Sequence, residues 1–384
     1  MTAAPESAAQ PYRLQVRPDS FTLSRGADLV LSFDLDGRPL TWFSEGTLHK
    51  RSLASQVLAR RRVEGSRERW TLTSEQALGQ FDQVKAWLHE AREQDPSLLS
   101  SPLLTRAAAW TPRRLLDEQR RFSLAYSPIS ILPPDQYYSV VVQVTRGCSW
   151  NQCTFCTFYR DRPFTTLPAT EFQAHLEQVD ALLGGSLALR RSIFLADGNA
   201  LMVSNARLLP SLASVRTAFP GRPVNGFVDV FTGQRKSVSD WRALRDAGLK
   251  RVYVGLETGH DPLLAWVNKP GGREASRQFI SQLKEAGLEV GVIVMTGLGG
   301  LTYASGHVSD TSALLEQLPL SSGDLVYLSP FVEHGPYKTR ATEDNVASLP
   351  EVDRLSQELH FRSLLSKAHP GVRVARYDIR EFIY

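Results

Sequence analysis

The residues of this chain with the clearest capacity for chemistry are three cysteines in one short segment. Cys148, Cys153 and Cys156 lie within nine residues, and the 384-residue sequence contains no other cysteine. Three thiols cannot all pair as disulfides, and one reactive thiol would be left over. Closely grouped thiolates are instead the ligands of metals and iron–sulfur clusters in a reducing compartment. The spacing therefore predicts a metal or cluster site in a cytoplasmic protein.

A [4Fe-4S] cluster held by these three thiolates would leave one iron without a protein ligand. That iron could bind the amino and carboxylate groups of a methionine moiety and place its sulfonium beside the cluster. Gly147 precedes the first cysteine and relaxes the backbone where the loop must wrap the cluster. The alternative is a structural zinc site with a remote histidine as fourth ligand. Zinc sites usually show two paired ligand clusters, and this chain has one.

The elements that must position the cysteines begin near Tyr138, where short apolar runs start to alternate with amphipathic stretches. This alternation predicts repeated βα units with parallel strands, in either a doubly wound sheet or an incomplete barrel. The predicted strands are Val140–Val144, Ser192–Ala196, Val224–Val230, Arg251–Leu256, Glu289–Thr296 and Leu325–Leu328. The predicted helices are Ala169–Leu183, Asn205–Phe219, Ser239–Ala247, Arg273–Ala286, Ser309–Leu318 and Val352–Ala368. Strand carboxyl ends carry the chemistry in both folds, and the cysteines follow the first strand.

The residues before the first strand lack this alternation and are predicted to form a separate extension, mixed and mainly helical. A hairpin is expected over Leu29–Trp42, with Asp36 and Gly37 in its turn. Helices are expected over Ser74–Arg92 and Arg106–Phe122. The predicted domains are the extension at 1–135, the catalytic core at 136–335, and a C-terminal helix with an edge strand at 336–384 that complete the core.

At the cysteine segment the sequence resembles the radical S-adenosylmethionine (radical SAM) superfamily, whose usual signature is C-x3-C-x2-C with an aromatic residue before the last cysteine. Phe155 matches that aromatic, whereas the first spacer, Ser149–Gln152, has four residues instead of three. The resemblance implies that Cys148, Cys153 and Cys156 hold a [4Fe-4S] cluster, that S-adenosylmethionine binds beside it, and that the core is an incomplete (β/α)6 TIM-like barrel.

The resemblance also implies a reaction. The cluster would cleave S-adenosylmethionine reductively to a 5'-deoxyadenosyl radical, which abstracts hydrogen from a substrate. An external one-electron donor such as flavodoxin or ferredoxin would be a partner. The chain lacks the additional cysteines that methylthiotransferases and auxiliary-cluster maturases require, so a single-cluster enzyme is expected. Its substrate and catalytic residues are not assigned by the sequence.

Three further segments at strand ends follow the order of the family's motifs. Asp197, Gly198 and Asn199 resemble the Gly-Gly-Glu-like motif that binds the cosubstrate's amino group, with an Asp-Gly turn as the alternative. The segment Gly-Leu-Glu-Thr-Gly around Glu257 resembles one found in the branch of methylthiotransferases and the elongator subunit. Glu257 is therefore expected to contact the cosubstrate, with a solvated strand-end carboxylate as the alternative. Gly297 lies in a glycine loop expected beside the adenine.

The stretch Lys50–Arg69 is strongly basic, with seven lysine and arginine residues against Glu64 and Glu68. Such a stretch could contact RNA. Charge runs are usually solvated faces, however, and no aromatic stacking platform interleaves this one. The sequence therefore favours a solvated face over a nucleic-acid site.

Composition sets the remaining limits. A hydrophobic fraction of 42% and a net charge of +4 are ordinary for a globular protein. Met1–Gln10 is predicted to be a disordered tail without the apolar run of a signal peptide. No segment approaches the roughly 20 apolar residues of a membrane-spanning helix, so no membrane partner is expected. The competing hypothesis is a non-enzymatic iron–sulfur or zinc protein that senses redox state or binds RNA, which would not need Asp197 and Glu257 at the site.

Overall fold

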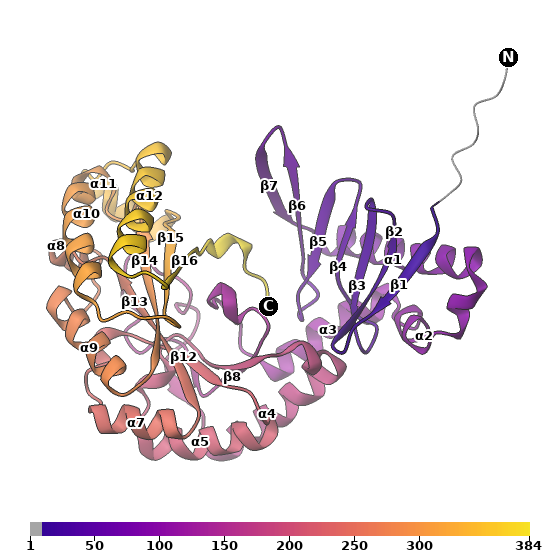
Figure 1. Ribbon diagram of the computed structural model, residues 1–384, viewed down its shortest axis with the longest axis horizontal. Helices are drawn as coiled ribbons and strands as arrows, with labels where there is room; N and C mark the ends of the chain where they lie inside the picture. The colour runs from indigo at the N-terminus through magenta and orange to yellow at the C-terminus, as the bar shows by residue number, and fades with distance from the viewer. Residues whose placement is uncertain (1–9) are drawn as a thin grey trace. The chain divides into compact units, whose positions relative to one another are not determined.

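The structure is a computed structural model that describes residues 10–384 (Figure 1). The predicted N-terminal tail lies, except for Gln10, outside the described residues. The chain divides into two compact units. Unit 1 comprises Met1–Pro128, Gln178–Arg190 and Ile383–Tyr384, and unit 2 comprises Ile129–Glu177 and Arg191–Phe382.

Unit 2 is built on a seven-stranded parallel sheet with the order β16-β15-β14-β13-β12-β11-β8. Its strands are β8 (Ser139–Gln143), β11 (Ser192–Ala196), β12 (Val224–Val228), β13 (Leu249–Glu257), β14 (Glu289–Thr296), β15 (Leu325–Pro330) and β16 (Arg373–Arg376). Every residue of β8, β11, β12 and β15 is buried, as expected for parallel strands covered on both faces. The predicted α/β class with a parallel sheet is confirmed.

Helices connect these strands and cover the sheet (Figure 1). They are α4 (Ala169–Leu183), α5 (Asn205–Ala218), α6 (Val230–Gly233), α7 (Val238–Asp246), α8 (Asp261–Trp266), α9 (Arg273–Glu285), α10 (Gly300–Gln317), α11 (Gly335–Glu343) and α12 (Glu351–Ala368). The helix predicted at Ser309–Leu318 begins nine residues earlier, at Gly300. The small residues of its first two turns weaken the apolar period, so the sequence pattern missed them.

The extension in unit 1 was predicted to be mainly helical, and this prediction is wrong, because its first part is a seven-stranded antiparallel sheet in sequence order. The strands are β1 (Tyr12–Val16), β2 (Ser20–Arg25), β3 (Leu29–Asp34), β4 (Pro39–Ser44), β5 (Thr47–Arg51), β6 (Val57–Val63) and β7 (Ser66–Thr71). Each strand is only five to seven residues long, so its two-residue alternation is too short to stand out from a mixed sequence. The hairpin predicted around Asp36 and Gly37 is present as β3 and β4.

Three helices follow this sheet and lie on one side of it (Figure 1). They are α1 (Ser74–Gln94), α2 (Pro102–Ala108) and α3 (Pro112–Ala125). Phe81, Val84 and Leu88 of α1 pack into one core with Trp42 of β4, whose indole Nε1 donates to Gln80 at 2.9 Å. The helices therefore cover the face of the sheet that carries the alternate apolar residues.

A buried ionic network crosses the core of unit 1 at Arg38. Its guanidinium contacts Asp34 Oδ2 at 2.7 Å and Glu118 Oε2 at 3.0 Å, and all three side chains are at most 3% exposed. The same guanidinium donates to the carbonyl oxygens of Leu182, at 2.8 Å, and Leu183 at the end of α4. One arginine thus satisfies two buried carboxylates and the last carbonyls of a helix.

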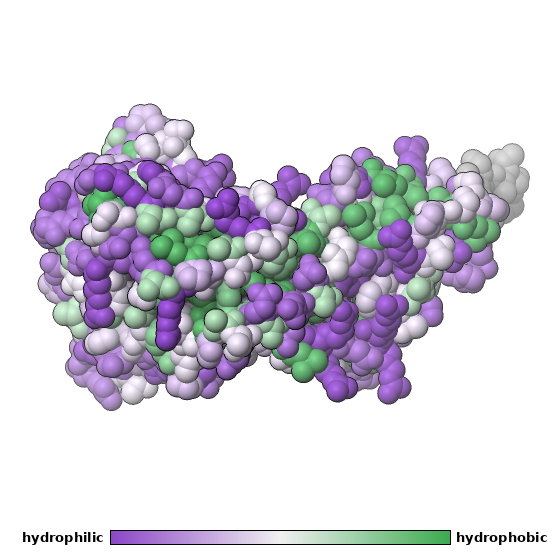
Figure 2. Space-filling model, turned by 90° about the horizontal axis from the view of Figure 1, so that it is seen from below, coloured by the Kyte–Doolittle hydropathy of each residue, from purple (hydrophilic) through white to green (hydrophobic). Residues whose placement is uncertain are grey.

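Among residues 10–384, no helix combines the length and the apolar character that crossing a bilayer requires. Figure 2 shows hydrophilic side chains over much of one face, with hydrophobic side chains gathered in small groups between them.

We expect Arg38→Met to lower the free energy of unfolding by about 3–5 kcal/mol, because it leaves the buried Asp34 without its counter-charge and Glu118 with Arg121 alone. The matched control is Arg61→Met, which breaks an ion pair with Glu68 whose side chains are 50% and 45% exposed. The control should cost less than about 1 kcal/mol. Urea unfolding followed by circular dichroism measures both losses, and equal losses would contradict the network's role.

Candidate functional site

The three cysteines lie on a loop between two short strands, β9 (Thr145–Arg146) and β10 (Thr165–Thr166), which pair antiparallel. Gly147 opens the loop with a φ of 80°, and a Cβ there would lie 2.9 Å from the carbonyl oxygen of Pro163. Only glycine allows this close approach of the two ends of the loop. The loop therefore leaves the end of β8 and returns to it as a closed segment.

Asp197, which is predicted to bind the cosubstrate, forms hydrogen bonds with both ends of this loop. Its Oδ2 accepts hydrogen bonds from the Gly147 N–H at 3.0 Å and from Arg162 Nε at 3.2 Å, and its Oδ1 accepts from Gln143 at 3.3 Å. Burial raises the pKa of Asp197, and the Gly147 N–H and the Arg162 guanidinium act against that shift. The Asp197 carboxylate thus holds the loop at Gly147 and at Arg162. It is not among the residues that line the cavity described below.

The opposite side of the loop is tied to the segment that follows α8. The Thr154 N–H donates to the carbonyl oxygen of Val267 at 3.0 Å, and the indole of Trp150 donates to that of Asn268 at 2.8 Å. These bonds place Lys269 beside the cysteines. No local sequence pattern indicates this contact, since Lys269 lies more than a hundred residues after the cysteines.

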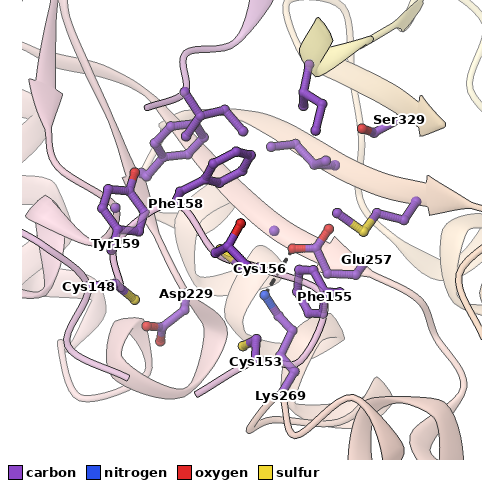
Figure 3. Close-up of a pocket in the computed structure, with 18 of the residues that line it drawn as sticks. Cys148, Cys153, Phe155, Cys156, Phe158, Tyr159, Asp229, Glu257, Lys269 and Ser329 are labelled. Atoms are coloured by element: carbon purple, nitrogen blue, oxygen red, sulfur yellow. Dashed lines mark hydrogen bonds and ion pairs between the residues drawn. The ribbon is translucent and has the colours of Figure 1, made fainter. Parts of the chain in front are cut away.

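All three cysteines line one cavity of about 310 Å³ at the carboxyl ends of the strands (Figure 3). Its wall is mainly aromatic and aliphatic. The aromatic residues in it are Trp150, Phe155, Phe158, Tyr159, Phe227, Phe231, Phe331 and Tyr377. The polar side chains in it include Asp229, Glu257, Lys269, Ser329 and His334. The structure therefore brings together the predicted residues Cys148, Cys153, Phe155, Cys156, Gly198 and Glu257.

The thiols face this cavity in a low-dielectric setting. Burial raises the pKa of Cys153 to about 12 and that of Cys156 to about 11, and Lys269 acts to lower both. Within residues 10–384, no three cysteine, histidine or carboxylate side chains converge as a mononuclear metal site. The three thiols line the same cavity, and a [4Fe-4S] cluster held there would bind each cysteine through a different iron.

Glu257 sits at a distortion in β13. Gly255 pairs with Ile293 of β14 and Glu257 pairs with the next residue, Val294, so Leu256 is an extra residue in the ladder. Glu257 itself has a φ of 62°, which non-glycine residues rarely adopt. A bulge re-aims the side chain that follows it. Here it turns the carboxylate back over Gly255, where a Cβ would lie 2.4 Å from Glu257 Oε1.

Lys269 pairs with this carboxylate inside the cavity (Figure 3). Its Nζ lies 3.0 Å from Glu257 Oε1, and the two side chains are 12% and 8% exposed. The same ammonium lies 5.6 Å from the centroid of the Phe155 ring, in a cation–π contact. Burial acts to lower the pKa of Lys269, but the charges of Glu257 and Cys153 raise it overall. Lys269 is therefore a permanent cation beside the cysteines.

The other predicted residues fall into different places. Asn199 is 1% exposed and lies behind the wall, where its amide donates to Ser149 of the cysteine loop at 3.0 Å and contacts the Asp229 carboxylate. Asn199 is thus a support for the loop and for Asp229. Gly297 lies outside the cavity and donates its N–H to Gln357 of α12 at 2.8 Å. The expected place of Gly297 beside a cosubstrate stays a prediction.

Comparison with known proteins gives one family and several similar folds. Residues 142–308 match the Radical SAM superfamily. A comparison with curated protein sequences finds no match. Coproporphyrinogen III oxidase from Escherichia coli is similar in structure, with 15% identity and a TM-score of 0.43, over 65% of this chain and 56% of that one. This chain therefore spans little more than half the length of that enzyme.

Two other solved structures are similar at the same level. Methylornithine synthase has 15% identity and a TM-score of 0.42, over 62% of this chain and 70% of that one. SuiB from Streptococcus suis has 11% identity and a TM-score of 0.42, over 87% of this chain and 71% of that one.

Thr258, the residue after Glu257, contacts the buried side chain of His307. We expect this histidine to make the stability of the fold sensitive to acid. His307 is fully buried, and its Nδ1 lies 2.8 Å from the Thr258 hydroxyl. Burial lowers its pKa from 6.5 to about 4, and His260 acts in the same direction. The unfolded chain therefore takes up this proton first as the pH falls, and the folded state loses up to about 3 kcal/mol between pH 6.5 and pH 4.

Urea unfolding at pH 7 and pH 4 tests this expectation. His307→Gln keeps a hydrogen-bonding group near Thr258 but removes the titration, so its stability should fall less over this range than that of the unaltered chain. The matched control is His89→Gln, whose histidine side chain is 75% exposed. A pH dependence that survives in His307→Gln would show that other groups carry it.

Proposed function

We propose that this chain is a radical SAM enzyme with Cys148, Cys153 and Cys156 as its three cluster ligands, because residues 142–308 match the Radical SAM superfamily, whose enzymes use a [4Fe-4S] cluster and S-adenosylmethionine. The observation that carries this proposal is that the three thiols line one cavity together with the Glu257–Lys269 pair. A reduced cluster held by these three thiols would supply the one electron that cleaves S-adenosylmethionine to methionine and a hydrogen-abstracting 5'-deoxyadenosyl radical.

The chain's own residues would bind and orient the cosubstrate. Lys269 donates to Glu257 Oε1, and the remaining acceptor sites of this carboxylate, including Oε2, would accept from the ribose hydroxyls or the ammonium of S-adenosylmethionine. Phe155 lies under the Lys269 ammonium and helps to fix it. Asp197 and Asn199 act through the loop: they position the cysteines without touching the cavity. The aromatic wall excludes water from the radical's path.

The strand order supports an incomplete barrel. The six strands that precede helices run in sequence order from β8 to β15, and the edge strand β16 follows β15. We propose that these strands form the (β/α)6 part of a TIM-like barrel, with the cavity at its carboxyl end. The external electron donor, such as flavodoxin or ferredoxin, belongs to the same proposal. The narrower likeness to the elongator and methylthiotransferase branch depends on the segment around Glu257 alone and stays a prediction.

The competing hypothesis of a zinc or iron–sulfur sensor explains the cysteines but not the rest of the cavity. A structural metal site needs only its ligands. It does not require the strained Glu257 and the buried Lys269, which line a cavity of about 310 Å³. Buried ion pairs are costly to form, and their retention inside a cavity points to a bound polar molecule.

We expect each of Cys148→Ala, Cys153→Ala and Cys156→Ala to abolish cluster binding. After anaerobic reconstitution the unaltered chain should hold about four irons and show visible iron–sulfur absorbance. With dithionite and S-adenosylmethionine it should also release 5'-deoxyadenosine. Thr154→Ala, in the same loop, is the matched control and should keep both properties. Zinc in place of iron, or 5'-deoxyadenosine formation by Cys153→Ala, would contradict the assignment.

The charges of Lys269 and Glu257 should shift the cluster's reduction potential in opposite directions. Lys269→Met removes a cation, so the potential should become more negative. Glu257→Gln removes an anion, so it should become more positive. A shift on the order of 60 mV corresponds to about 1.4 kcal/mol for one electron. The double variant should return close to the starting potential, because it removes both charges.

Redox titration monitored by electron paramagnetic resonance measures these potentials. The control is Lys250→Met, because the side chain of Lys250 is 53% exposed and its charge is screened by water. Equal potentials in the control and in Lys269→Met would show that Lys269 does not act on the cluster.

A further inference from the structure

The antiparallel sheet of unit 1 has one face that its helices do not cover. On the covered face, Trp42, His49, Ala59 and Trp70 follow one another across β4 to β7 in register. The first three are buried in the core, and Trp70 is 36% exposed at the edge. On the other face, the neighbouring row in register is Phe43, Leu48, Arg60 and Arg69. We call this second face of β4–β7 the outer face.

The outer face ends in two cross-strand pairs of arginines. Arg60 lies opposite Arg69, and Arg62 lies opposite Arg67, in the hairpin of β6 and β7. Side chains two residues apart on a strand share a face, so all four belong to the outer face. In Figure 1 this hairpin reaches beyond the end of β5. Like charges directly opposite each other destabilise a sheet, so the Arg62–Arg67 pair opposes the fold unless an anion binds there.

The opposite side of the same hairpin is built differently. There Arg61 pairs with Glu68 at 2.7 Å and lies 5.5 Å from the centroid of the Trp70 ring. Within residues 10–384, by contrast, no such carboxylate pairs with Arg60, Arg62 or Arg67, and all three are exposed. The positive charge is therefore concentrated on the outer face.

The rest of the outer face carries apolar and aromatic surface. Phe43 and Leu48 are partly exposed in the row that leads to Arg60, and Lys50 lies on the same face of β5. An aromatic ring beside a line of cations is the combination that holds unpaired bases by stacking and phosphates by charge. A flat sheet face can present both to a single strand, whereas the bases of a duplex are not free to stack on it.

We propose that the outer face of β4–β7 binds single-stranded nucleic acid, with Arg60, Arg62 and Arg67 on the phosphates and Phe43 stacked on a base. The basic stretch alone favoured a solvated face. The pairing register shows in addition that the arginines lie opposite one another on one face. They share this face with Phe43, which precedes Arg60 by seventeen residues. This inference does not depend on the proposed reaction.

Fluorescence anisotropy with a labelled oligouridylate of about 12 nucleotides tests the proposal on the full chain, with the matching oligodeoxythymidylate as a second probe. The triple variant Arg60→Gln, Arg62→Gln and Arg67→Gln should weaken binding at least tenfold. It should also reduce the slope of log affinity against log salt by about 2, since each phosphate contact contributes roughly 0.7. Phe43→Ala should weaken binding roughly tenfold without changing that slope.

The matched control removes the same charge from the helical side of unit 1, with Lys85→Gln on α1 and Arg113→Gln and Arg120→Gln on α3, all of them exposed. The control should bind as the unaltered chain does. Unchanged circular dichroism and urea midpoints would confirm that the variants fold.

Four results would overturn the proposal. The first is that the unaltered chain does not bind the oligonucleotides at low salt, and the second is that the control loses as much affinity as the triple arginine variant. The third is that the chain binds a duplex of the same length with equal affinity. The fourth is that the triple variant loses affinity for phosphatidylserine vesicles but not for the oligonucleotides. The last result would assign the arginines to an anionic membrane surface instead.

Discussion

A loop that carries three thiols can serve one cavity only if its two ends are fixed, and in this chain a single buried carboxylate fixes both. Asp197 accepts from the Gly147 N–H at 3.0 Å and from Arg162 at 3.2 Å. Because its side chain is 2% exposed, water cannot replace these donors. The placement of the thiols therefore depends on a residue that never reaches the cavity, which is a common way to hold ligands in a chosen orientation.

The second constraint acts on the opposite side of the cavity. The bulge at Leu256 and the positive φ of Glu257 cost backbone energy, and the surrounding structure maintains them. The distortion places the Glu257 carboxylate over Gly255, where it pairs with Lys269 close to the cysteines. Within this pair the negative and the positive charge offset each other while keeping two strong hydrogen-bonding groups available in the cavity.

The sequence predicted the parts of the site that depend on local order. The strands of unit 2 are continuous apolar runs, so their ends, and the polar residues after them, could be located from the pattern alone. Lys269 could not be found in this way, because tertiary bonds from Thr154 and Trp150 bring it to the cysteines. Asp197 and Gly297 were placed at the correct strand ends, yet their contacts with Arg162 and Gln357 depend on segments that the motifs do not include.

The antiparallel sheet of unit 1 shows why the extension was misread and what that concealed. Short strands with one buried face place polar residues at every second position, and a run such as Arg60–Arg62 then resembles a charged helix or loop. Once the register is known, the same residues separate into two faces with different neighbours. Arg61 gains an acidic partner and an indole, whereas Arg60 and Arg62 face other arginines. The fold therefore divides one basic stretch of the sequence between two faces of the sheet, and only the pairing register shows which arginines share a face.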